Sequence, residues 1–336
     1  MIFYWFLLSL DWALADLVTI LRAAGESNRI RILTLCADCD LSAGELTRIL
    51  GQSQPSISRH LRLLCDAGLL ERHQEGSWAF FHLPTSGTVA KIVRFMVEQI
   101  EDDNPLVIRD RDRLDAIKRE RRARSERYFN QNAARWDQIR TMHVDEQRVE
   151  SEIRNMVSTL QVKDLLDIGT GTGRMLQLCA DQVQHAIGID LSHDMLSVAR
   201  VNLSEPSFNH CIVRHADMYG LPFGSPSFDL AILHMVLHFA DQPWDVIGEA
   251  SRVIRSGGHL LLVDFAPHDV QELREKHEHR RLGFRNKEIA SWSKSHLLKI
   301  SKAQSLPSKN LTVNIWLLSK GHTHAPMHAN LPQRSG

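Results

Sequence analysis

The chain has 336 residues, with 40 basic and 40 acidic side chains and a formal net charge of zero. Its length predicts about two domains, and a hydrophobic content of 43% is enough to form packed cores. Zero net charge excludes recognition of nucleic acid or of an anionic membrane by a bulk field, so any DNA contact must be local. The five cysteines are odd in number and lack the spacing of a secreted disulfide framework, which predicts a reducing, cytoplasmic location.

The first stretch, Ile2 to Leu10, is apolar. It lacks the basic residues of a signal peptide and meets Asp11 too early to span a bilayer, so no membrane association is expected. Two interpretations stay open. The stretch is either an additional helix or dimer surface, or an upstream extension that results from a wrongly chosen start codon.

Residues 10–84 have the pattern of a small α+β domain. Apolar spacing predicts helices over 10–24, 27–35, 42–50 and 56–67, and two strands within 69–83. Ser42 and Glu45 have the spacing of a capping box, Pro55 suits a first helical turn, and Gly51 and Gly68 are placed to end helices. Two helices joined by a glycine turn and followed by a β-hairpin predict a winged helix-turn-helix.

The segment from Ser53 to Leu64, SQPSISRHLRLL, resembles the recognition helix of ArsR/SmtB-type bacterial repressors. The resemblance implies a homodimer that binds double-stranded operator DNA through this helix, which enters the major groove, and through the wing. The residues that it implies as DNA contacts are Gln54, Ser56, Ser58, Arg59, His60 and Arg62 in the helix, with Arg72 and Trp78 in the wing.

Two observations limit this interpretation. Residues 1–86 contain seven arginines, no lysine and nine acids, so nonspecific affinity for DNA should be modest. A solvated helix face is the alternative explanation for Arg59 and Arg62. Metal sensing is common in the resembled family, but Leu41–Leu46, where its thiophilic members carry Cys-x-Cys, holds no cysteine.

Other candidate ligands for metals have simpler explanations. Cys36 and Cys39 suit a redox pair or part of a soft-metal site, but burial of Cys36 as a small hydrophobe is the favoured interpretation. A second group gathers after residue 264, where an exposed polar helix is favoured over a ligand set; it consists of His268, Glu272, Glu275, His277 and His279. No metal site is therefore predicted.

Residues 101–127 are dense in charge and predict a helical linker. Leu114 and Ile117 are three residues apart, as one helix face would place them. A solvated connecting helix is favoured, and contact of its basic half with DNA phosphates is the alternative. The next residues, from Tyr128 to Asp137, resemble the N-terminal helix that covers the cofactor site in ubiquinone methyltransferases.

The segment 164–173, DLLDIGTGTG, reads as a buried strand that ends in an acid and breaks into three alternating glycines. Such glycines allow positive φ and a close approach of backbone to a ligand. Their spacing departs from the G-x-G-x-x-G fingerprint of dinucleotide-binding proteins. Asp167 would be poorly placed beside a pyrophosphate at a helix N-terminus, and it suits a cationic amino acid moiety.

Further strand-and-acid pairs follow. An apolar run over 186–189 ends in Asp190, 23 residues after Asp167, near the separation of an acid that binds ribose hydroxyls. Asp217 follows a third strand, and runs at 228–233 and 259–263 predict a fourth and a fifth. These motifs predict an α/β fold with a mostly parallel, doubly wound sheet.

Over residues 127–318 the sequence resembles class I S-adenosylmethionine-dependent methyltransferases, especially the ubiquinone and menaquinone C-methyltransferases. The resemblance implies a Rossmann-like domain that binds S-adenosylmethionine or S-adenosylhomocysteine. The alternative is a doubly wound domain with an unrelated nucleotide or no ligand. The implied cofactor residues are Asp167, Gly169, Thr170, Gly171, Gly173, Asp190, Leu191, Met195, Asp217, Met218 and His234.

Catalytic residues are less defined, because transfer of a sulfonium methyl group can proceed largely by positioning. His234 and His238 are weak candidates for a base, and a role as polar lining of the pocket is the alternative. The segment 234–239, HMVLHF, lacks the motifs of DNA amine and cytosine C5 methyltransferases. The resemblance to the ubiquinone and menaquinone methyltransferases implies a small-molecule methyl acceptor.

The predicted organisation is a DNA-binding and dimerisation domain over 1–100, a linker over 101–127, a methyltransferase domain over 128–319 and a disordered tail over 320–336. A helix from Asn286 to Leu298 and a last strand over 311–318 are expected near the end of the sheet. Two functions remain open. One is a transcription regulator that senses the cofactor, resembling S-adenosylhomocysteine-responsive regulators of methionine-cycle genes; the other is an active small-molecule methyltransferase with an appended regulatory domain.

Overall fold

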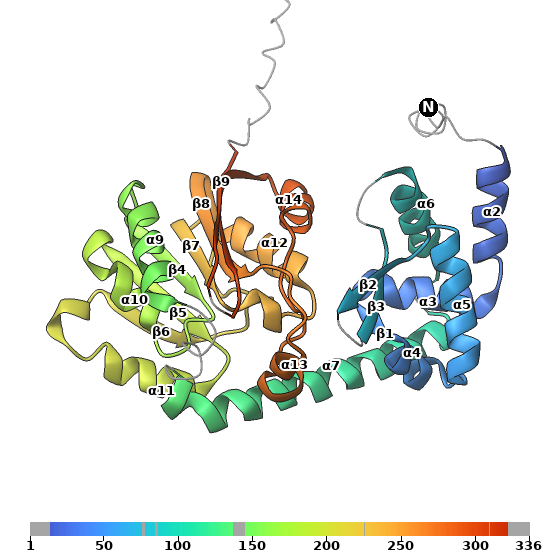
Figure 1. Ribbon diagram of the computed structural model, residues 1–336, viewed down its shortest axis with the longest axis horizontal. Coiled ribbons are helices and arrows are strands. Elements are labelled where there is room, and N and C mark those ends of the chain that lie inside the picture. The colour runs from blue at the N-terminus through green and yellow to red at the C-terminus, as the bar shows by residue number, and fades with distance from the viewer. Residues whose placement is uncertain are drawn as a thin grey trace, which may run out of the picture. The chain divides into compact units, whose positions relative to one another are not determined.

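The computed structural model describes residues 14–75, 78–84, 87–101, 103–136, 145–224, 226–308 and 310–321 (Figure 1). The expectations for Ile2 to Leu10, and those for the tail beyond residue 321, lie outside these residues. The chain forms two compact units. The first consists of Met1–Trp136, Val236–Val246 and Phe265–Trp292, and the second of Asp137–Met235, Ile247–Asp264 and Ser293–Gly336.

The N-terminal part of the first unit is a winged helix-turn-helix, as predicted. Helix α4 begins with the expected capping box, in which Ser42 and Glu45 exchange hydrogen bonds, and it ends at Gly51 with φ 64°. A three-stranded antiparallel sheet of order β1-β3-β2 forms the wing. The elements are α2 Leu14–Ala24, α3 Ser27–Asp38, β1 Leu41–Ser42, α4 Ala43–Leu50, α5 Gln54–Asp66, β2 Glu71–Glu75, β3 Trp78–His82 and α6 Gly87–Glu98.

Helix α7, Pro105–Asn132, runs without interruption through the segment that was predicted as a linker. Asn104 caps it by accepting a hydrogen bond from Leu106 N at 3.0 Å. Leu114 and Ile117 are 1% and 4% exposed and belong to the same apolar core as α3, α4 and α5. The helix is therefore not solvated throughout, because one stripe of it completes the core of the DNA-binding domain.

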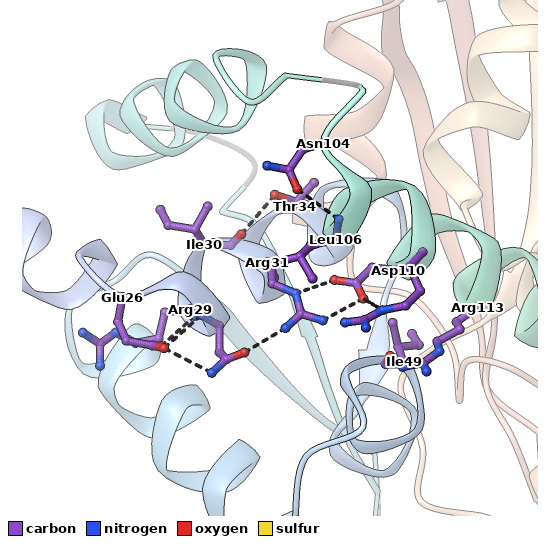
Figure 2. A network of polar contacts seen from close by, with 12 residues as sticks. Glu26, Arg29, Ile30, Arg31, Thr34, Ile49, Asn104, Leu106, Asp110 and Arg113 are labelled. Atoms are coloured by element: carbon purple, nitrogen blue, oxygen red, sulfur yellow. Dashed lines mark hydrogen bonds and ion pairs between the residues drawn. The ribbon is translucent and has the colours of Figure 1, made fainter.

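A polar network ties the start of α7 to α3 and α4 (Figure 2). Arg31 donates two hydrogen bonds to Asp110, at 2.5 and 2.7 Å, and both side chains are buried. Arg113 donates to the carbonyl of Ile49 at the end of α4, at 2.7 Å. Bidentate contacts of this kind fix orientation as well as distance, so α7 is held to the domain by directed contacts and by apolar packing.

The second unit contains a seven-stranded sheet of order β6-β5-β4-β7-β8-β10-β9. The first five strands in this order, β6, β5, β4, β7 and β8, pair in parallel, and β10 pairs with β9 in antiparallel fashion. The sheet is thus mostly parallel, which confirms the predicted fold class. The strands are β4 Asp164–Ile168, β5 His185–Asp190, β6 Cys211–His215, β7 Phe228–His234, β8 Ile254–Phe265, β9 Leu298–Leu306 and β10 Val313–Lys320. The helices are α9 Glu146–Ser158, α10 Arg174–Cys179 and α11 His193–Asn202, with short 3-10 helices η2 Ala180–Gln182 and η3 Pro206–Phe208, and α12 Pro243–Val253 begins in the first unit and ends in the second.

The first unit also contains η1 Ala133–Arg135 at the end of its first segment, and η4 Leu237–Phe239, α13 Gln271–His277 and most of α14 Asn286–Lys294 in its later segments. Helix α14 begins at Asn286 as predicted but ends at Lys294, so the expected helix to Leu298 is too long. Leu298 instead begins β9 after the positive φ of Leu297, 60°. In β9 charged and apolar residues alternate, as in a strand at the edge of a sheet. Leu298 also fits the apolar spacing of the preceding helix, so the sequence pattern did not separate the two elements at this point.

Candidate functional site

The glycine turn lies where β4 ends, in the second unit. Gly169, Gly171 and Gly173 have φ of 73°, 53° and 83°, a region that favours glycine. The N–H groups of Gly169 and Thr170 both donate to the carbonyl of Ile189 in β5, at 2.8 Å. The turn is thus fastened to the neighbouring strand, and α10 begins directly after it.

A fourth glycine, which the motif search missed, makes room for this turn. A Cβ on Gly188 in β5 would lie 2.5 Å from Oγ1 of Thr170 and 2.8 Å from Cδ1 of Leu176. A glycine inside a strand often marks a close approach of backbone. Its position, two residues before Asp190, is the sequence signal that could have identified it.

Asp167 is 1% exposed, and its Oδ2 has no hydrogen-bond partner among the described residues. Burial raises the pKa of this carboxyl to about 7, and the neighbouring charge of Asp190 adds to the rise. An orphaned, buried carboxylate oxygen costs free energy unless a ligand satisfies it. This geometry would suit the cationic ammonium of an amino acid moiety, and that role of Asp167 stays a prediction.

Asp190 is the last residue of β5, and its charge contributes to the raised pKa of Asp167. Its carboxylate accepts hydrogen bonds from Gly171 N at 2.9 Å and from Ser192 N at 2.8 Å. Burial raises its pKa although these backbone bonds act in the opposite direction. The acid is thereby oriented at the carboxyl end of the strand, the edge where ligands bind in open α/β sheets.

The other predicted cofactor residues follow the same edge of the sheet. Leu191 comes directly after β5, and Met195 lies 2% exposed in α11. Asp217 follows β6 and accepts a hydrogen bond from Tyr219 N at 3.0 Å, with Met218 between the two. These residues thus lie at the carboxyl ends of adjacent parallel strands. That each of them binds the cofactor stays a prediction.

The two weak catalytic candidates differ in their surroundings. His234 is the last residue of β7 in the second unit, and Met235 after it has a positive φ of 55°. His238 lies in the first unit, 2% exposed, with its ring stacked on that of His279 at a centroid distance of 4.0 Å. Packing is therefore a sufficient reason for His238, and a catalytic role for either residue stays a prediction.

The recognition helix α5 separates its two faces as the pattern predicted. Ile57, Leu61 and Leu64 are buried in the core. On the outside, four of the predicted DNA contacts are exposed and available to a ligand. They are Gln54, Ser58, Arg59 and Arg62.

The remaining predicted contacts are placed differently. Ser56 and His60 are half-buried and contact each other at 3.4 Å, and His60 Nδ1 lies 3.6 Å from Glu26. His60 thus points to the start of α3 rather than only outward. In the wing, exposed Arg72 donates to Gln74 at 2.6 Å, and Trp78 begins β3 opposite Glu75.

The cysteine pair is buried, with Cys36 3% and Cys39 0% exposed. Burial raises the pKa of both thiols, so both are held in the protonated form, which is unreactive and a poor metal ligand. Within the described part of the chain no group of three His, Cys, Asp or Glu side chains is arranged to hold a metal ion. In the later His-rich segment, His279 is 7% exposed and lies past the end of α13, so its assignment to an exposed helix is wrong.

Comparison with known proteins identifies both domains. Residues 26–72 match the bacterial regulatory protein model of the arsR family, and residues 166–262 match the methyltransferase domain model. The uncharacterized methyltransferase YcgJ of Bacillus subtilis is 31% identical over 106 residues, which cover 31% of this chain and 42% of the relative. The demethylmenaquinone methyltransferase of Clavibacter sepedonicus is 26% identical over 186 residues, 49% of this chain and 75% of the relative.

The malonyl-acyl-carrier-protein O-methyltransferase of Marinomonas sp. is 28% identical over 200 residues, which cover 56% of this chain and 72% of the relative. The solved structure of YcgJ from Bacillus subtilis superposes with a TM-score of 0.47 at 18% identity, covering 53% of this chain and 100% of that chain. The chain spans less than half of the first of these relatives, so the matches identify domains and not an activity. In the described residues no helix is long and apolar enough to cross a membrane.

The chain therefore joins an ArsR-family helix-turn-helix domain to a class I methyltransferase domain, a fold that implies binding of S-adenosylmethionine or S-adenosylhomocysteine.

Proposed function

We propose that this protein is a DNA-binding transcription regulator whose operator affinity changes when the methyltransferase domain binds S-adenosylhomocysteine or S-adenosylmethionine. Its targets would be genes of the methionine cycle or of methylation. A ligand can shift such an equilibrium only if it binds the DNA-competent and DNA-incompetent states with different affinity. The sulfonium charge gives a physical basis for distinguishing the two ligands, because only S-adenosylmethionine carries it.

The observation that carries this proposal is helix α7. Its first half supplies Leu114 and Ile117 to the core of the DNA-binding domain. Near its other end, Tyr128 Oη lies 2.6 Å from His277 Nδ1, and the ring of Phe129 packs on that of Phe239 at a centroid distance of 4.8 Å. One continuous helix thus contacts both the repressor core and the segment that follows β7 of the methyltransferase sheet.

A buried arginine in the middle of α7 supports the same route. Arg121 is 8% exposed and donates hydrogen bonds to Glu45 of α4, at 2.5 and 3.0 Å. It also donates to Asp241 at 2.7 Å. Burial alone would lower the pKa of Arg121, but the charges of Asp241 and Glu45 outweigh it, and the pKa is raised above its ordinary value. Because α4 is the first helix of the helix-turn-helix, movement of Asp241 would act on the DNA-binding domain through Arg121.

The experiment is a titration of the full chain with each ligand by calorimetry, followed by operator binding at fixed salt. Operator fragments come from selection of genomic DNA on the purified protein. Ligand binding with a change of at least fivefold in operator affinity supports the regulator. Binding that leaves DNA affinity unchanged contradicts it. The Asp167→Asn variant is the matched control, since it should lose the ligand response while it keeps the DNA-binding surface.

A second function is favoured by the family matches alone. The relatives described above are named as methyltransferases, and so is an arsenite methyltransferase of Halobacterium salinarum, 30% identical over 115 residues. We infer from this that the alternative, an active enzyme with a small-molecule acceptor, deserves a direct test. Release of S-adenosylhomocysteine with a panel of thiol, phenol, amine and quinol acceptors would support it, and no turnover with any of them would count against it.

We further propose that the DNA-bound form is a cytoplasmic homodimer. Helix α2 leaves Leu14, Leu17 and Leu21 exposed at 78%, 38% and 54%, an apolar face at helical spacing that a second copy would cover. All five cysteines are free thiols, which suits a reducing compartment. A monomer in light scattering at working concentration would contradict the dimer.

A further inference from the structure

A cavity of about 500 Å³ lies within the first unit, and none of its lining residues is among those predicted to hold the cofactor. Its walls come from residues 40–48, from Phe80 of β3, from helix α7, from residues 240–241 and from residues 274–281. Seven arginines and five acidic side chains line it, a surplus of two cations. This surplus is local, because the chain as a whole has no net charge.

Most of the acids around the cavity are already engaged by arginines. Arg281 pairs with Asp40, and Arg48 pairs with Glu120 at 2.9 Å. Arg121 takes both Glu45 and Asp241, as described above. Four of the five acids are thus engaged by arginines, and Arg124 pairs with Glu278 outside the lining at 2.5 Å, so Arg280 has no carboxylate to itself.

Arg280 is the guanidinium with the weakest compensation in this group. Its Nε lies 3.5 Å from Asp241, a carboxylate that it shares with Arg121. Its Nη2 is buried and has no hydrogen-bond partner among the described residues. A buried N–H donor of a charged group is costly to leave unsatisfied.

The electrostatics point in the same direction. Burial lowers the pKa of Arg280, and Arg121 and Arg124 nearby lower it further. Burial also lowers the pKa of Arg274 to about 10, with added repulsion from Arg280 and Arg281. Crowded, partly desolvated guanidinium groups are stabilised by an anion, and their planar forks suit the oxygens of phosphates and carboxylates.

We propose that this cavity is a second ligand site, which binds a small anion bearing phosphate or carboxylate oxygens, with Arg280 as its central contact. The site is separate from the methyl-donor site and does not depend on the sensor function proposed above. Because its walls include Glu45 and Arg48 of α4, an anion would link occupancy of the cavity to the helix-turn-helix.

The test uses calorimetry on the full chain without DNA, with inorganic phosphate, pyrophosphate and citrate as probes. Potassium chloride keeps the ionic strength constant, so that screening does not change between titrations. Saturable binding of at least one probe below roughly 10 mM is expected. Pyrophosphate alone would assign a phosphate site, citrate alone a carboxylate site, and binding of no probe would overturn the proposal.

Variants locate the site. Arg280→Gln should weaken the bound probe roughly tenfold or more, because it removes a charged hydrogen-bond donor, while Arg280→Lys should retain part of the affinity. Arg285→Gln is the control, an exposed arginine outside the cavity lining. If Arg280→Gln does not fold, Arg127→Gln replaces it, since Arg127 lines the cavity and is exposed. Equal loss in the control, or none in the lining variants, would refute the site.

Discussion

Replacement of Asp110 by alanine should destabilise the DNA-binding domain strongly, although Asp110 lies outside the arsR-family match. The side chains of Arg31 and Asp110 are 10% and 4% exposed and form two hydrogen bonds, so removal of the carboxylate leaves a buried guanidinium (Figure 2). Breaking one partner of a buried pair costs about 3–5 kcal/mol. The hydrogen bond from Arg31 to Asn28, at 2.9 Å, remains and favours the lower end of that range.

The assay is hydrogen exchange of the slowest amides in α3, which reports the free energy of local opening in a chain with two units. An increase in exchange of roughly a hundredfold or more corresponds to the expected loss. Glu120→Ala is the matched control. It also removes a carboxylate of α7 that pairs with an arginine, Arg48, but those side chains are 61% and 59% exposed, and the cost should stay below about 1 kcal/mol.

A double variant, Arg31→Met with Asp110→Leu, removes both charges and should recover much of the loss, since apolar replacement of a buried ion pair is often close to neutral. Equal exchange rates for Asp110→Ala and Glu120→Ala would refute the reasoning. They would mean that the Arg31 guanidinium reaches water when its partner is removed, and that the packing of α7 does not depend on this pair.

Four other predictions concern the two ligand-binding surfaces. An ammonium ligand requires the ionised form of Asp167, and the pKa of this carboxyl is raised to about 7 in the free protein. The affinity for S-adenosylhomocysteine should therefore be constant above pH 7 and fall about tenfold per pH unit well below it. An affinity that stays flat from pH 5 to 8 in calorimetry would contradict this. The same shift should make the ligand-free protein less stable as the pH rises from about 4 toward 7, since the folded state then holds a proton that the unfolded state has lost. Gly188→Ala should cost about 1–3 kcal/mol by overpacking against Thr170 and should weaken cofactor binding in calorimetry, an effect absent if the turn can move away. Arg59→Ala should reduce operator affinity and lower the salt slope by about one, and an unchanged slope in binding assays at several salt concentrations would leave Arg59 without a phosphate contact.

The sequence predicted the parts of the fold that local chemistry determines. The capping box of Ser42 and Glu45, the helix end at Gly51 and the glycine turn after Asp167 are all encoded within a few residues, and the structure has them where expected. The mostly parallel sheet followed from the succession of apolar runs and acids.

The errors concern contacts between segments far apart in the sequence. The charge density of α7 predicted a solvated helix, although one face of the helix is buried. Its ion pair with Arg31 could not be predicted, because Arg31 and Asp110 are 79 residues apart and only the fold brings them together. Similarly, His60 was predicted to face outward from α5, but it lies beside Glu26, which is far from it in the sequence. The cavity around Arg280 was not predicted either, since its walls come from five separate stretches of the chain.

Helix α7 also changes what counts as a transferable piece of this protein. The arsR-family match ends at residue 72, but the core is completed by Leu114 and Ile117. With 28 residues, α7 is about 42 Å long, more than the DNA-binding domain needs for its own core. A gene fusion that moved only residues 26–72 would thus leave this core open unless the new partner supplied a helix with a suitable apolar stripe. The segment that can be transferred intact is the arsR-family domain together with α7, and any domain fused after this helix is joined to a core that is already closed.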